Sequence, residues 1–253
     1  MGEGLEEELQ QGVIIIQSID EVAEEWIVDV EYEIIDMESN TILQTIGSNR
    51  EGVAVSEALD YEKTYIVRQS NIANPYQLNE EEFHIELEDE EYNVKFENIW
   101  HDHIKKIKYM DRDIEITEVF IPVNPVLQNP ELPNGCEITS LTSVLNYYGY
   151  DTDKLQMADI YLPKQPFARK EGKLYGANPF EAYAGDPRDG VGGFFCYAPP
   201  LLEAANSYFN DFNGSHNPLD ISMSDRGEII DYLNKGIPIV IWVPIDLQKP
   251  RIN

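Results

Sequence analysis

Two kinds of hydrophobic pattern divide the chain. In the first half, short segments alternate apolar with acidic residues, most clearly in Val28–Ile34. This period of two is typical of a half-buried strand. The other strand-like segments are Val13–Ile16, Val53–Val55, Thr64–Val67, Phe83–Leu87 and Tyr92–Phe96. Turn residues separate them about every ten residues, and the pattern predicts an antiparallel β-sandwich.

Helical spacing appears in the second half, directly after Cys136. The apolar residues at i, i+3 and i+7 spacing are Ile138, Leu141, Val144, Leu145 and Tyr148. They predict a helix that Gly149 can end.

Three further elements are predicted nearer the C-terminus. Pro199–Phe209 reads as a short helix, and Ser224 is a candidate N-cap for another helix that ends at Gly236. Ile239–Val243 is an uninterrupted apolar segment and predicts a strand. This mixture of helices and strands predicts an α+β fold for the second half.

Charge excludes some classes of partner. The chain has 47 acidic and 18 basic residues and a formal net charge of −29. A nucleic-acid binder needs the opposite sign, and an anionic membrane surface would repel this chain. The longest apolar run, Ile237–Ile245, has half the length that spans a bilayer, so no membrane insertion is expected.

The charge also indicates two domains. Residues 1–121 hold 31 acids and 8 bases, against 16 and 10 in the rest, and every proline except Pro75 lies at Pro122 or later. The predicted organisation is an acidic tail (1–11), a β-sandwich (12–100), a linker with one strand (101–121) and a second domain (122–253). Met1–Gln11 is acidic and lacks the apolar core of a signal peptide.

The sequence has too few neighbouring cysteines and histidines to predict a metal site or a disulfide framework. Cys136 and Cys196 lie sixty residues apart, and two cysteines make no framework. His101 and His103 could supply at most two neighbouring ligands, with no third nearby. We therefore expect no metal site and no cofactor, and we interpret this segment as an exposed linker.

Cys136 is the main candidate for chemistry. The breakers Pro130, Pro133 and Gly135 precede it, and the predicted helix follows. At a helix N-terminus, unpaired N–H groups and the macrodipole favour a thiolate and can stabilise an oxyanion. From the residues alone, both a reactive thiol and a small packed side chain remain open. Cys196 follows a glycine-rich turn with no helix start behind it and is interpreted as structural.

The first half resembles the prealbumin-like SpaA/Cna-B repeat of Gram-positive surface proteins over residues 12–98. The resemblance rests on Ile27–Ile35, Ile42–Thr45, the turn at Gly52, Tyr65–Gln69 and Pro75–Leu78. In that family a Lys and an Asn can form an isopeptide bond with the help of a Glu. Asn98 occupies the Asn place, but Gln17 falls at roughly the Lys place and Gln69 at the Glu place. Because an amide cannot replace the amine, we predict no crosslink.

The second half resembles the papain-like cysteine peptidases of family thirty-nine type, related to the bacteriocin-leader peptidases, over residues 115–245. The resemblance is carried by Gln128–Leu141, Val144–Gly149, Tyr161–Lys164, Gly185–Pro187, Tyr197–Pro199 and Ile237–Trp242. It implies that Cys136 is the nucleophile, that Gln128 is the oxyanion donor, and that the substrate is a peptide or protein.

One element of that family is not found. Its general base is a His on a strand after the one that Ile239–Val243 resembles, whereas His216 lies in a loop before the last predicted helix. We interpret His216 as an exposed loop residue, and we expect the domain to be truncated. Residues 1–253 are then expected not to hydrolyse peptides. Ile239–Val243 is expected to present an unpaired edge that favours self-association.

Two functions from different classes follow. One is a cell-surface or secreted bacterial cysteine peptidase with a β-sandwich spacer, acting through an acyl-enzyme on Cys136. The other is a non-catalytic surface adhesion or binding module. The resemblance to Gram-positive surface proteins implies an extracellular or cell-surface location.

Overall fold

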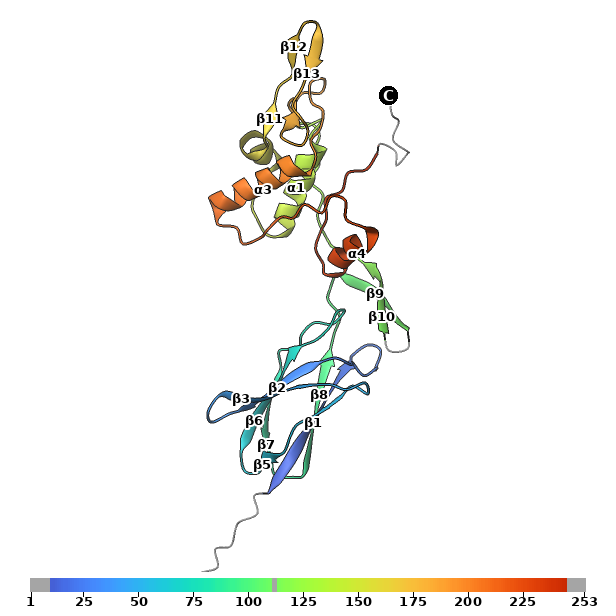
Figure 1. The fold of residues 1–253 in the computed structure, drawn as a ribbon, viewed down its shortest axis with the longest axis vertical. Coiled ribbons are helices and arrows are strands. Elements are labelled where there is room, and N and C mark those ends of the chain that lie inside the picture. Colours follow the sequence, from blue (N-terminus) through green and yellow to red (C-terminus); the bar gives the residue numbers. More distant parts are fainter. Residues whose placement is uncertain (1–9, 111–112, 245–253) are drawn as a thin grey trace, which may run out of the picture. The chain divides into compact units, whose positions relative to one another are not determined.

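The computed structural model describes residues 10–110 and 113–244, which fold as two compact units divided between Val119 and Phe120 (Figure 1). Each unit has its own hydrophobic core. The first unit is all-β, and the second combines helices with short strands, as predicted. In the described part of the chain, no helix has the length and apolarity that a bilayer crossing requires.

The first unit contains two four-stranded sheets. Its strands are β1 (Gln11–Asp20), β2 (Glu31–Asp36), β3 (Thr41–Gly47), β4 (Val53–Val55), β5 (Leu59–Asp60), β6 (Thr64–Asn71), β7 (Glu82–Glu86) and β8 (Glu91–Asn98). One sheet joins β4, β5 and β8 to β1, and the other has the order β3-β2-β6-β7.

The period of two in the sequence becomes the core of this unit. Alternate residues of β1 are buried, among them Ile14 and Ile16 with no exposed surface. Tyr32 of β2 and Phe96 of β8 stack between the two sheets with ring centroids 5.6 Å apart. The inward faces are therefore apolar, and the acidic residues of the same strands lie mainly on the outer faces.

The prediction of a wholly antiparallel sandwich was wrong. β1 and β8 pair in parallel, from Val13 opposite Glu91 to Asp20 opposite Asn98. Alternation shows which residues face inward but carries no information on strand direction. The predicted strand at Val28–Ile34 also starts later, at Glu31, because Asp29 has a left-handed backbone (φ 56°) that interrupts the extended chain.

A buried polar cluster corrects the assignment of Gln17. The inward residue of β1 is Ser18, whose Oγ accepts a 2.7 Å hydrogen bond from Nε2 of Gln69. The amides of Gln69 and Asn98 also pair with each other, at 2.9 and 3.0 Å. Successive strand residues face opposite sides, so Gln17 points away from Gln69 and Asn98 and cannot take the Lys place beside them. Ser18 also lacks an amine.

Residues 101–121, expected to be a linker with one strand, hold a hairpin of β9 (Ile104–Met110) and β10 (Asp113–Val119). The hairpin is attached to β1 through the buried carboxylate of Asp20. That carboxylate accepts hydrogen bonds from the hydroxyls of Tyr76 (3.0 Å) and Tyr109 (2.6 Å) and from Nε1 of Trp100 (2.7 Å). Two backbone N–H groups of the following turn complete the set. The sequence analysis did not predict β9, because its lysines interrupt the alternation of apolar and polar residues.

The second unit is built around two helices. Its elements are α1 (Cys136–Tyr147), α2 (Lys154–Gln156), the π-helical turn η1 (Met157–Tyr161), β11 (Lys164–Gln165), β12 (Ala168–Lys170), β13 (Lys173–Tyr175), β14 (Tyr183–Ala184), α3 (Ala198–Phe212) and α4 (Arg226–Asn234). Ile138 and Leu145 of α1 are packed in one core with Ala204 and Tyr208 of α3. Gly149 (φ 82°) follows α1 as predicted, in a left-handed conformation that suits glycine.

Two expectations for the second unit were wrong. The N-cap of α4 is Asp225, whose Oδ1 accepts from the N–H of Glu228 at 3.0 Å, and not Ser224. Ile239–Val243 forms no strand. A strand needs a hydrogen-bonded neighbour, and in the described residues this segment has none; Ile241 stays 67% exposed.

Asp20 is expected to control the stability of the first unit. Burial alone raises its pKa, but the hydrogen bonds from Tyr109, Ala23, Trp100 and Val22 bring the pKa below its ordinary value. Asp20→Ala leaves these buried donors unpaired and should lower the free energy of unfolding by about 3 kcal/mol. Urea unfolding at neutral pH measures this, with the exposed Asp89→Ala as a control expected within about 0.5 kcal/mol.

The pH dependence follows from the same shift. Because the folded pKa of Asp20 lies below the unfolded value of about 3.9, its stabilisation is present at neutral pH and is lost as the pH falls through the folded pKa. The stability difference between the natural chain and Asp20→Asn should therefore shrink in acid. A difference that is constant from neutral pH into acid would contradict the role given to the carboxylate.

The polar cluster predicts an intact mass. With Ser18 in place of an amine donor, Asn98 should keep its side-chain nitrogen. Electrospray mass spectrometry of the denatured protein should give the full mass of the sequence. A species lighter by one ammonia would show that an isopeptide bond forms from another lysine.

Candidate active site

Cys136 is the first residue of α1 and is exposed, whereas Cys196 is completely buried. The preceding Gly135 permits the tight approach of the chain to this helix start. A Cβ on Gly135 would lie 2.8 Å from Cβ of Leu132, closer than side-chain carbons pack. The breakers before Cys136 therefore place the thiol at a helix N-terminus, as the sequence indicated, and the structure has it exposed at the surface.

The loop before α1 holds Gln128 in a defined position. The N–H of Leu132 donates to the carbonyl of Gln128 at 2.9 Å, and the Leu132 side chain is fully buried. In the same loop, Nε2 of Gln128 donates to the carbonyl of Pro133 at 2.8 Å. A primary amide carries two N–H hydrogens, and Pro133 takes one of them.

Lys154 of α2 fixes this loop from outside. Its side chain is 14% exposed, and Nζ donates to the carbonyls of Leu127 (2.5 Å) and Gln128 (3.0 Å). Nζ also forms a 2.6 Å ion pair with Glu131, which lowers the pKa of that carboxyl. The backbone on which Gln128 sits is thus anchored by one cation.

The glycine-rich segment after β14 supports the residue before Gly135. Nδ2 of Asn134 donates to the carbonyl of Asp189 at 2.7 Å, and the Tyr183 hydroxyl donates to the carbonyl of Asn134 at 2.5 Å. Gly185 has φ 96°, and a Cβ there would lie 1.9 Å from the carbonyl oxygen of Gly192. These glycines serve close backbone packing.

Sequence reasoning missed Glu137. Although charged, it is only 6% exposed, and its carboxylate lies between the two cysteines. Sγ of Cys136 donates to Oε2 at 3.2 Å, and the N–H of Cys196 donates to Oε1 at 3.3 Å. The signals in the sequence are that Glu137 belongs to the motif Gln128–Leu141, which carries the family resemblance, and that it adjoins Ile138 on the apolar side of the predicted helix.

The expected thiolate is not favoured in this structure. Partial burial of the sulfur, the charge of Glu137 and the hydrogen bond to it raise the pKa of Cys136 to about 11. The backbone N–H groups at the start of α1 act in the opposite direction, as expected, but they are outweighed. Burial also raises the pKa of Glu137 and of Cys196.

His216 is an exposed loop residue, as interpreted from the sequence, and it lies far from Cys136. Its Nδ1 is 2.6 Å from the Tyr150 hydroxyl, and its ring lies 4.2 Å from that of Tyr148, centroid to centroid. Both tyrosines follow the C-terminal end of α1. With 12 residues, α1 separates its two ends by about 18 Å. His216 therefore cannot exchange a proton with the Cys136 thiol.

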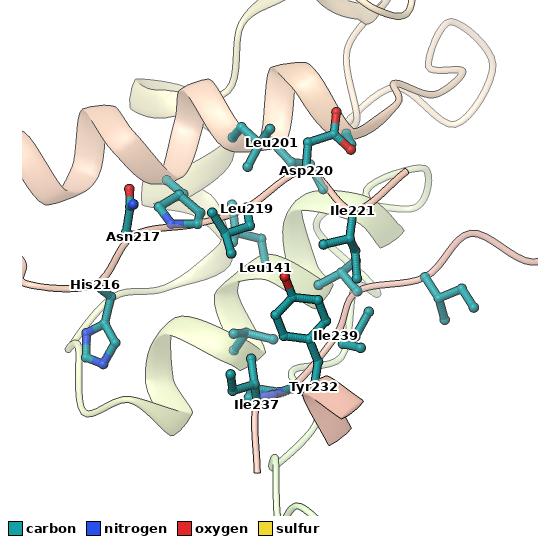
Figure 2. Close-up of a pocket in the computed structure, with 18 of the residues that line it drawn as sticks. Leu141, Leu201, His216, Asn217, Leu219, Asp220, Ile221, Tyr232, Ile237 and Ile239 are labelled. Carbon is teal, nitrogen blue, oxygen red and sulfur yellow. The ribbon is translucent and has the colours of Figure 1, made fainter. Parts of the chain in front are cut away.

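An apolar pocket of about 460 Å³ lies elsewhere in this unit (Figure 2). It is formed by α1, α3, α4, the loop that carries His216 and the segment Ile237–Trp242. Figure 2 shows His216 at its edge and Leu141, Tyr232 and Ile239 toward its centre. Neither Cys136 nor Gln128 lines it, so the pocket is separate from the thiol.

Among residues 10–110 and 113–244, no group of three His, Cys, Asp or Glu side chains converges as metal ligands do. His101 and His103 stack with ring centroids 5.4 Å apart at the turn before β9. Burial lowers the pKa of His101, and the neighbouring His103 lowers it further.

Residues 120–251 match the model of the Peptidase_C39 like family, and residues 12–100 match the model of the SpaA prealbumin-like fold domain. The chain belongs to the Peptidase_C39 like family. The resemblances found in the sequence are thereby confirmed, in the same order along the chain. A Bacillus subtilis (strain 168) protein, the uncharacterized YvpB, is 33% identical over 126 residues, which are 48% of this chain and 46% of YvpB.

Solved structures of other proteins are also similar to part of this chain. The Bacillus anthracis TIE protein is 20% identical with a TM-score of 0.33, covering 36% of this chain and 17% of its own. GBS52, the minor pilin of Streptococcus agalactiae, is 13% identical with a TM-score of 0.33, covering 40% of this chain and 49% of its own.

The exposure of the two cysteines predicts different reactivities. Cys136 should be alkylated by iodoacetamide faster than Cys196 near neutral pH, because the reagent reaches only an exposed sulfur. Peptide mapping after timed alkylation separates the two sites, and Cys136→Ser gives the background. Equal rates, or faster labelling of Cys196, would count against Cys136 as the accessible nucleophile.

Proposed function

We propose that this chain is a cysteine-peptidase-like protein whose reactive group is Cys136, with Gln128 as its oxyanion donor. The observation that carries the proposal is the exposed thiol at the first residue of α1, directly after a loop that holds the Gln128 amide. A thiol nucleophile, helix N–H groups and a neutral amide donor are the parts that acyl transfer requires.

The chemistry is the transfer of an acyl group from a peptide amide. Sγ of Cys136 attacks the carbonyl carbon, and the carbonyl oxygen becomes an oxyanion that the Gln128 amide and the N–H of Cys136 stabilise. Collapse of this intermediate breaks the C–N bond, and the amine leaves with a proton. Water then attacks the thioester carbonyl, which releases the acid and restores the thiol.

Two proton transfers in this reaction need an acid and a base next to Sγ. In residues 113–244 His216 is the one histidine, and it lies at the far end of α1. Glu137 holds the thiol proton by a hydrogen bond but raises the pKa of the thiol. The described residues thus supply a nucleophile and an oxyanion donor without an imidazole partner.

A surface adhesion or binding module is the second candidate. It is supported by the match to the SpaA prealbumin-like fold domain, and by the lack of an imidazole partner for Cys136 among residues 113–244. For either function we propose an extracellular or cell-surface location, supported by the match to the SpaA prealbumin-like domain. We also propose self-association through the apolar residues Ile239–Val243, of which Ile241 is 67% exposed.

Gln128 can be tested by comparing two reactions of one thiol. Acylation of Cys136 by p-nitrophenyl acetate passes through an oxyanion, whereas alkylation by iodoacetamide does not. Gln128→Ala should slow acylation by about tenfold to a hundredfold and leave alkylation within about twofold. Gln165→Ala, an exposed glutamine on β11, is the matched control and should change neither rate.

Cys136→Ala should abolish the acylation in every background. If Gln128→Ala slows acylation and alkylation equally, the glutamine acts on the position of the thiol and not on the oxyanion. That result would contradict the role proposed for Gln128.

Hydrolysis gives a separate prediction. Residues 1–253 should cleave no peptide bond at a detectable rate, because the described part of the second unit has no imidazole within reach of Cys136 to transfer a proton to the leaving amine. Mass spectrometry of a peptide library incubated with the protein measures this, with Cys136→Ala as control. Cleavage that disappears in Cys136→Ala would show that these residues contain a working base.

A further inference from the structure

We propose that Glu137 is a positioning residue that holds Cys136 as a neutral thiol and directs its Sγ. The inference rests on the proposed function insofar as it concerns the same thiol. It adds a resting state in which the proton is on the sulfur and is hydrogen-bonded to Glu137. This proton must be removed before Cys136 can act as a nucleophile.

The geometry of the pair supports this role. Sγ of Cys136 lies 3.2 Å from Oε2 of Glu137, which is a hydrogen-bonding distance for a thiol donor. Glu137 is 6% exposed, so its carboxylate is removed from water while it accepts this bond. A negative charge at this distance opposes the formation of a thiolate and stabilises the S–H form.

The carboxylate is fixed from its other side. Its Oε1 accepts from the N–H of Cys196 at 3.3 Å, and the carbonyl of Cys196 accepts from Nε1 of Trp242 at 2.9 Å. Cys196 is fully buried, so the core around it holds this peptide unit in place. Because Glu137 is bonded at both oxygens, it cannot turn away from the thiol without breaking a buried hydrogen bond.

The other ionisable groups around the pair do not offset the charge of Glu137. Cys196 and Tyr183 face it, and Asp186 lies near Tyr183. None of these side chains is a cation, and burial raises the pKa of both Cys196 and Tyr183. The helix N-terminus contributes the opposing effect, through the backbone N–H groups of Cys136 and Glu137.

This arrangement protects an exposed thiol. At neutral pH, alkylation, oxidation and disulfide exchange all require the thiolate, whose population Glu137 lowers. A cation brought next to Cys136, such as an imidazolium, would offset the charge of Glu137 and release the nucleophile. Glu137 therefore couples reactivity at Cys136 to the arrival of a positive partner.

The test is the pH profile of alkylation at Cys136. Glu137→Gln keeps the size of the side chain and removes its charge. It should move the midpoint of the profile down by about one pH unit and make alkylation near pH 7.5 about tenfold faster. Glu203→Gln, on the exposed side of α3, is the matched control and should leave the profile unchanged. Glu137→Asp retains the charge and should stay closer to the natural chain than Glu137→Gln does.

A profile that is the same in the natural chain and in folded Glu137→Gln would overturn the proposal. If Glu137→Gln does not fold by circular dichroism, Glu137→Ala replaces it, and the natural chain gives a further check: a midpoint at or below the ordinary thiol value of about 8.5 overturns the proposal. Burial alone also raises the pKa of Cys136, so a higher midpoint counts as support only where it falls by about one pH unit in folded Glu137→Ala. The assay reads the proton on Cys136 without any acyl transfer, so it can fail while the Gln128 test succeeds, and the reverse.

Discussion

The placement of the Cys136 thiol depends on the anchoring of the loop that precedes α1. A single largely buried ammonium, that of Lys154, bonds to the carbonyls of Leu127 and Gln128 and pairs with Glu131. The buried Leu132 side chain holds the middle of the loop, and Gly135 lets the chain turn into the helix. Since an oxyanion donor acts only where it is held in advance, the proposed role of Gln128 depends on these contacts.

The fold was largely readable from periodicity. Strict alternation of apolar and polar residues located most strands of the sandwich, because one face of each strand is buried and the other is exposed to solvent. It could not show that β1 and β8 run parallel, since both directions give the same alternation. Nor could it separate Ser18 from Gln17, because the buried cluster with Gln69 and Asn98 is polar and is invisible to a hydrophobic pattern.

The site was readable where chain breakers and a family motif coincide. Crowded Pro and Gly residues before Cys136 predicted a thiol at a helix start, and the structure has it there, in an exposed residue. The acidity of that thiol was not predictable, because it depends on Glu137, whose burial arises from tertiary packing against Cys196. Ile239–Val243 failed as a strand for a related reason: apolar character alone does not supply a hydrogen-bonded neighbour.

The central claim is that Cys136 and Gln128 form one acyl-transfer site. A crystal structure of the protein with a peptide aldehyde bound to Cys136 tests it most directly. The account predicts a hemithioacetal on Sγ, with its oxygen about 3 Å from Nε2 of Gln128 and from the N–H of Cys136. An adduct whose oxygen points into solvent, with the Gln128 amide still bonded only to Pro133, would contradict it.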